Sequence, residues 1–113
     1  MATRQIEQEH WGRYFDNLST VLGTELAEIE VAGLDLGDQV EAEWLQLIGI
    51  SYDRKDDVLS FQLEGVEHLI QGPREVYVEE DDDGLHSIEV VDGDGHRHIV
   101  RLRAALALPS PVT

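Results

Sequence analysis

Hydrophobic residues near the start of the chain recur at helical spacing. Trp11, Phe15, Leu18 and Leu22 lie at positions i, i+4, i+7 and i+11, which places them on one face of a helix. Gly23 follows directly, and glycine is a common residue at the end of a helix. The pattern therefore predicts an N-terminal amphipathic helix whose apolar face is buried.

After Gly23 the hydrophobic period changes to two, which is typical of half-buried strands. Turns rich in glycine and aspartate separate six such segments. These cover residues 25–31, 40–52, 59–63, 75–80, 85–91 and 96–103. Residues 65–72 fit either a short strand or a buried turn, because Gly72 and Pro73 interrupt whatever precedes them.

The last three segments are joined by short turns that each end in glycine, at Gly84 and Gly95. Three-residue hairpin loops with a left-handed final glycine suit both turns. Both loops then place the same apolar residues on one face, which predicts an antiparallel meander. That face consists of Val76, Val78, Ile88, Val90, Val100 and Leu102.

The earlier hairpin is given a register by the same reasoning. The apolar pattern pairs Tyr52 with Leu59, Ile50 with Phe61 and Ile48 with Leu63.

This element order predicts an α+β fold: one N-terminal helix packed on a curved antiparallel sheet, or a partly closed barrel, of about six strands. Residues 1–108 are expected to form a single domain. Residues 109–113 are expected to be a loose C-terminal tail, because Pro109 and Pro111 cannot continue a strand.

Composition narrows the classes of function. The 113 residues include 24 acidic and 8 basic side chains, giving a net charge of −16, and 42% are hydrophobic. The length suits one domain with its own core. The absence of cysteine excludes disulfides, thiolate metal sites and cysteine nucleophiles. The negative charge disfavours nucleic acid and membrane surfaces as partners, and no apolar run suggests a membrane span, so a cytoplasmic location is expected.

The order of short motifs resembles an uncharacterised bacterial family, the domain of unknown function 5335. The motifs are Trp11-x-x-Tyr14-Phe15-Asp16-x-Leu18-Ser19, Glu28-Ile29-Glu30-Val31, Leu36-Gly37-Asp38-Gln39, Gly49-Ile50-x-Tyr52-Asp53, Asp56-Asp57, His68-Leu69-Ile70-x-x-Pro73-Arg74-Glu75-x-Tyr77-Val78 and Val100-x-Leu102. The resemblance implies a short single-domain bacterial protein. It implies no activity and no catalytic residue.

His96 and His98 are the clearest candidate metal ligands, because alternate residues of a strand share one face. A third ligand is needed, and Glu89 is expected on the opposite face. The acidic turns at 79–83 and 92–94 lie at opposite ends of one strand, roughly 20 Å apart, so they cannot share an ion. These acids and histidines are therefore expected to be structural or solvated, with no metal and no cofactor.

Candidates for catalysis are weaker still. His68 precedes an apolar pair beside Gly72 and is expected to hydrogen-bond a turn carbonyl. No serine has the glycine framing of a nucleophile elbow, and no glycine-rich phosphate loop is present. No catalytic residue is assigned, and a non-enzymatic protein is expected.

The outward face of the predicted sheet offers an interaction surface consisting of Trp44, Tyr77, Ile99 and Arg101. Exposed apolar groups on a charged surface often mark contact sites, although a curled sheet would bury them instead. The leading hypothesis is a small binding or interaction module that contacts a protein partner or forms a homodimer through its sheet. The alternatives are an acidic mimic of nucleic acid that occupies a basic partner, and a metal-dependent enzyme that uses His96 and His98.

Overall fold

The computed structural model describes residues 2–33, 35 and 37–108, which form eight strands, one α-helix and one 3-10 turn. The elements are β1 (Ala2–Ile6), the 3-10 turn η1 (Gln8–His10), α1 (Trp11–Val21), β2 (Leu26–Gly33), β3 (Gly37–Asp53), β4 (Val58–Leu63), β5 (Val66–Gln71), β6 (Pro73–Asp81), β7 (Gly84–Asp92) and β8 (Arg97–Leu106). The expected tail at 109–113 lies outside the described residues.

The expected fold class was wrong. The chain is mostly β, with one short helix, and its eight strands form an antiparallel sheet in the order β1-β6-β7-β8-β2-β3-β4-β5 that does not close into a barrel. The sequence pattern missed β1 and left β5 undecided between a strand and a turn; these two strands are the ends of this order. Each buries a single side chain, Ile6 in β1 and Ile70 in β5, so neither shows the alternation by which strands are recognised.

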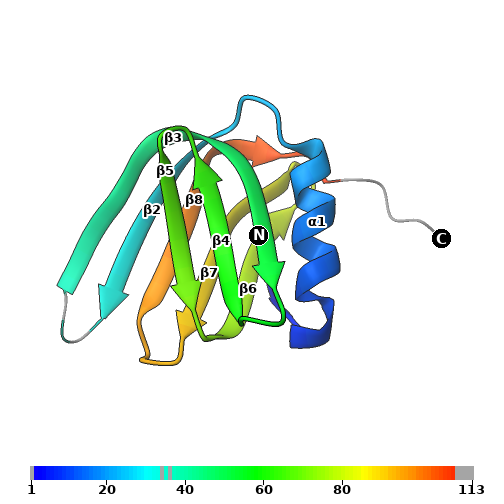
Figure 1. The fold of residues 1–113 in the computed structure, drawn as a ribbon. Coiled ribbons are helices and arrows are strands. Elements are labelled where there is room, and N and C mark those ends of the chain that lie inside the picture. Colours follow the sequence, from blue (N-terminus) through cyan, green and yellow to red (C-terminus); the bar gives the residue numbers. More distant parts are fainter. Residues whose placement is uncertain (1, 34, 36, 109–113) are drawn as a thin grey trace.

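A bend in β3 folds the sheet into two layers. The first part of this 17-residue strand pairs with β2, and its last part pairs with β4. Within the part paired with β2, at a shift in register between Ala42 and Leu45, Trp44 has φ 49°, a left-handed conformation rarely adopted by an aromatic residue. Figure 1 shows the result: β4, β5 and the end of β3 lie in front of β6, β7 and β8.

The core fills the space between these layers. The predicted meander face is buried, and the predicted pairings Val78–Ile88, Val76–Val90, Ile88–Val100 and Val90–His98 are confirmed. In the earlier hairpin Tyr52–Leu59 and Ile50–Phe61 are confirmed as well. The pairing of Ile48 with Leu63 was wrong: a bulge after Leu47 places Leu47 opposite Leu63 and leaves Ile48 55% exposed.

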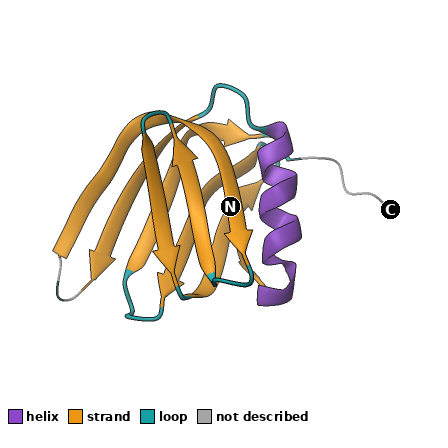
Figure 2. Ribbon diagram, viewed as in Figure 1, coloured by secondary structure: helices purple, strands orange, loops and turns teal. Residues whose placement is uncertain are grey.

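Helix α1 lies along one side of the two layers, against β3 (Figure 2). Its predicted apolar face is confirmed at Trp11, Phe15 and Leu18, which are buried, whereas Leu22 lies just past the end of the helix in an extended conformation and is half-buried. The Trp11 Nε1–H donates to the Ile6 carbonyl at 2.9 Å, and the Ser19 hydroxyl bonds both backbone groups of Ile50. None of the helices in the described part of the chain has the length and apolar character that crossing a bilayer requires.

Ionisation of Tyr14 on α1 is expected to destabilise the fold at alkaline pH. Its hydroxyl donates to Glu80 Oε1 at 3.0 Å, and burial together with the Glu80 charge raises the pKa of Tyr14 well above its ordinary value. The unfolded chain loses this proton near pH 10 while the folded chain keeps it, so the free energy of unfolding should fall as the pH rises above about 10. Urea unfolding between about pH 9 and 11 should show a steeper fall for the wild type than for Tyr14→Phe. Equal slopes would contradict the assignment.

Candidate functional site

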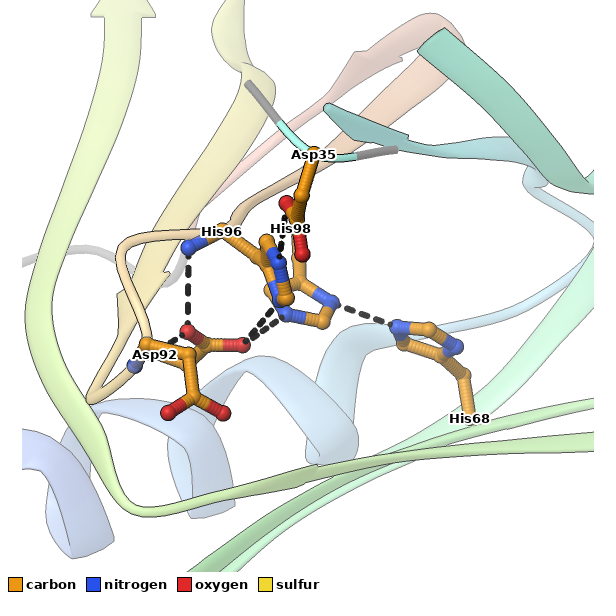
Figure 3. A network of polar contacts seen from close by, with 6 residues as sticks. Asp35, His68, Asp92, His96 and His98 are labelled. Carbon is orange, nitrogen blue, oxygen red and sulfur yellow. Dashed lines mark hydrogen bonds and ion pairs between the residues drawn. The ribbon is translucent and has the colours of Figure 1, made fainter. Parts of the chain in front are cut away.

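A chain of polar side chains lies between the two layers, near the β7–β8 turn (Figure 3). The His98 Nε2 is 2.8 Å from Asp92 Oδ2, and the His98 Nδ1 is 2.9 Å from His68 Nε2. Asp92 and His98 are the buried polar or charged residues of the described chain, at 8% and 7% exposure. His68 comes from β5 and His98 from β8, so these hydrogen-bonded side chains join the front layer to the back layer.

Asp92 is the centre of this cluster because of the turn that it begins. Its Oδ1 accepts the backbone N–H groups of Asp94 and His96, at 2.9 and 3.0 Å. Aspartate commonly caps a turn in this way. The other oxygen, Oδ2, is thereby aimed at the imidazole rings of His98 and His96, the latter with its Nδ1 at 3.7 Å.

His96 connects this turn to the β2–β3 turn. Its Nε2 lies 2.8 Å from Asp35 Oδ1. Gly33 makes room for the ring, because a Cβ at that position would come within 2.5 Å of His96 Cδ2. Two turns whose residues Asp35 and His96 are 61 positions apart in sequence are therefore held together by one histidine.

The environment shifts the protonation of three members of the cluster. Burial lowers the pKa of His68 and the neighbouring His98 lowers it further, while Glu41 opposes both. The hydrogen bond to Asp35 raises the pKa of His96. Burial alone would raise the pKa of Asp92, but hydrogen bonds from His98 and from the backbone of His96 and Asp94 outweigh it and lower the pKa.

Sequence reasoning named His96 and His98 but missed how they are joined. It sought a carboxylate on the facing strand at Glu89, whereas the carboxylate comes from Asp92, six residues before His98. The expectation that His68 bonds a turn carbonyl was wrong, because its Nε2 meets the His98 ring. The spacing Asp92-Gly93-Asp94-Gly95-His96-Arg97-His98 was the available signal, since an aspartate that begins a turn folds back over it.

The predicted interaction residues do not form one exposed patch. Tyr77 and Ile99 lie on the outer face of the back layer, on either side of Glu89, beside a shallow hollow of about 170 Å³. Arg101 is held by Glu30 at 2.8 Å and Glu28 at 3.3 Å. Trp44 lies at the bend of β3, with the Arg103 guanidinium 5.8 Å from its ring centre. All four side chains are half-buried, and their role in binding stays a prediction.

The groove beside α1 has no set of side chains that would select one class of ligand. A wide groove of about 920 Å³ runs beside the start of α1. Its lining mixes Arg13 and Arg54 with Glu7, Glu9 and Asp16, so it does not select a ligand of either charge.

These features define a small, mostly β protein built on one bent antiparallel sheet, with a histidine–aspartate cluster between its layers. Residues 2–111 match the family model DUF5335, a family of unknown function, and the chain belongs to that family, as its motifs predicted. An uncharacterised protein of Aquifex aeolicus (strain VF5) is 49% identical over 110 residues, which cover 96% of this chain and 99% of that protein. No solved structure matches the chain.

Proposed function

We propose that the protein is a small interaction module of the bacterial cytoplasm that pairs with a second copy of itself through β5. The observation that carries this proposal is the apolar character of an unprotected sheet edge. In the described part of the chain β5 has a neighbour on one side only, β4. Along this edge Val66 and Leu69 are 37% and 49% exposed.

Sheet edges invite pairing with another strand, and proteins that avoid it protect their edges with lysine, proline or bulges. Apart from the single charge of Glu67, β5 has none of these devices: its residues 66–71 contain neither lysine nor proline, and its pairing with β4 is regular throughout. The opposite edge differs. β1 carries Arg4, whose guanidinium is paired with Glu80 at 2.9 Å, and it exposes no large apolar side chain.

A second copy fits this edge without placing like charges together. Glu67, Leu69 and Gln71 point to the same side of β5, because alternate residues of a strand share a face. Antiparallel pairing about a two-fold axis at Leu69 places the two leucines opposite each other. It also places each Glu67 opposite Gln71 of the second copy, so no carboxylate faces another across the new pair.

Light scattering on the full chain tests the association. The wild type should be a dimer, and Leu69→Arg should be a monomer because a buried guanidinium without a partner prevents pairing. Val40→Arg is the matched control, since Val40 is also an exposed strand residue, at 58%, but lies far along β3 from β5. Added salt should strengthen the dimer, because two chains of charge −16 repel each other.

The absence of cysteine allows a test of the register. Leu69→Cys should form a disulfide between copies on mild oxidation, whereas Val40→Cys should not. A wild-type monomer at all concentrations, or equal dissociation by Val40→Arg, would overturn the proposal.

A further inference from the structure

Three potential ligand atoms converge at the β7–β8 turn. Asp92, Asp94 and His96 each offer one side-chain atom, and these atoms all lie within 4.8 Å of one another. The His96 Nδ1 is 3.7 Å from Asp92 Oδ2. A tetrahedral Zn²⁺ with bonds of about 2.0–2.2 Å separates its ligands by about 3.3 Å. Small side-chain adjustments close this difference, and the exposed Asp94 carboxylate is free to turn inward.

A second observation is that hydrogen bonds from neighbouring side chains already orient two of the three ligands, His96 and Asp92. His96 Nε2 is bound to Asp35, which leaves Nδ1 on the side of Asp92 Oδ2. The buried His98 bonds Asp92 Oδ2 and is itself bonded by His68. Outer hydrogen bonds of this kind fix the tautomer and the ring orientation of metal-binding histidines, and hold metal-binding carboxylates in place.

The charges of the cluster point to a cation. When His96 donates its Nε2–H to Asp35, the neutral ring presents a lone pair on Nδ1 to Asp92 Oδ2, and a ligand atom of Asp94 lies within 4.8 Å of those of Asp92 and His96. A lone pair and two negative groups repel one another unless a positive charge lies between them. A second proton on His96 supplies such a charge, and a metal ion supplies it with directional bonds to all three groups.

We propose that Asp92, Asp94 and His96 bind one divalent transition-metal ion, with water completing its coordination. One imidazole nitrogen and two carboxylate oxygens suit Zn²⁺ and its neighbours in the first transition row. They do not suit Ca²⁺, which takes six to eight oxygen ligands. His98, held by His68, acts as a positioning residue through Asp92. The site lies at the β7–β8 turn and does not depend on pairing through β5.

Calorimetric titration of the chelator-treated full chain with Zn²⁺ tests the site. We expect one ion per chain, loss of binding in His96→Ala and in Asp94→Asn, and no comparable response to Ca²⁺. Asp94 is exposed, so its amide variant keeps the fold. His86→Ala is the matched control and should leave Zn²⁺ binding unchanged. His86 lies 2.7 Å from Asp81 at the opposite hairpin turn, and these two side chains alone should bind Zn²⁺ only weakly.

Two further variants separate coordination from positioning. Gly33→Ala pushes the His96 ring aside and His98→Gln loosens Asp92, and each should weaken Zn²⁺ binding about 10- to 100-fold without abolishing it. In nitrogen-15 spectra of the imidazoles, Zn²⁺ should shift Nδ1 of His96 and leave His86 unchanged. Absence of Zn²⁺ binding, preference for Ca²⁺, equal binding by His96→Ala, or equal loss in His86→Ala would overturn the proposal.

Discussion

Replacing Phe15 with alanine is expected to lower the free energy of unfolding by about 3–5 kcal/mol. The Phe15 side chain is fully buried, and its ring meets Phe61 of β4 edge-on, with centroids 6.3 Å apart. It therefore joins α1 to the front layer. Removing the ring leaves a cavity in a close-packed core, onto which the surrounding structure collapses only in part.

Urea unfolding measures this loss, with an unchanged dependence on denaturant if only stability is altered. Asn17→Ala is the control, because Asn17 lies on the exposed face of the same helix and should change stability by less than about 0.5 kcal/mol. A change below about 1.5 kcal/mol for Phe15→Ala would contradict the burial described here.

Gly84→Ala is expected to be as damaging, for a different reason. Gly84 begins β7 with φ 124°, a conformation that residues with a side chain rarely adopt. An added Cβ would also come within 2.0 Å of the Leu106 carbonyl oxygen, a backbone atom that cannot turn aside. Backbone strain and overpacking each cost about 1–3 kcal/mol, so a total loss of about 2–6 kcal/mol is expected.

Two other glycines separate these costs. Gly65 has φ 79° but open space around its Cα, so Gly65→Ala should lower the free energy of unfolding by the backbone strain alone, about 1 kcal/mol. Gly12 lies in α1 with no atom near the added methyl, so Gly12→Ala should stabilise the helix by about 0.5–1 kcal/mol. If Gly84→Ala and Gly65→Ala cost the same in thermal unfolding, the contact with Leu106 is not the cause.

The sequence predicted those parts of the fold in which local pattern and burial agree. Helix α1 and the six inner strands alternate clearly because each buries several side chains. The bulge at Leu47–Gly49 was not predictable, because a bulge shifts the register by one residue without altering the composition of the strand. A second bulge, in β7, likewise places Leu85 rather than His86 opposite Glu80.

The candidate site was only half predictable, because its residues come from distant parts of the sequence. The bend at Trp44 brings β5 over β8 and thereby His68 to His98, and no periodicity in the sequence records that crossing. Asp35 reaches His96 because two turns share one end of the molecule (Figure 1). The spacing of Asp92, Asp94 and His96 within a single turn was visible in the sequence, and so was the pair His96 and His98.

The neighbours of β2 have a consequence for synthesis on the ribosome. β2 pairs on one side with β8, so Ala27 is joined to Leu102 and Ala32 to Arg97. Such long-range pairs form slowly, because a large loop must close before any contact is gained. While the last strand is still inside the ribosome, β2 and β7 each lack a neighbour and the back layer is divided. The β3–β4–β5 hairpins can form earlier, whereas the core can close only after β8 has left the ribosome. Chaperone binding to the nascent chain should therefore persist until β8 emerges.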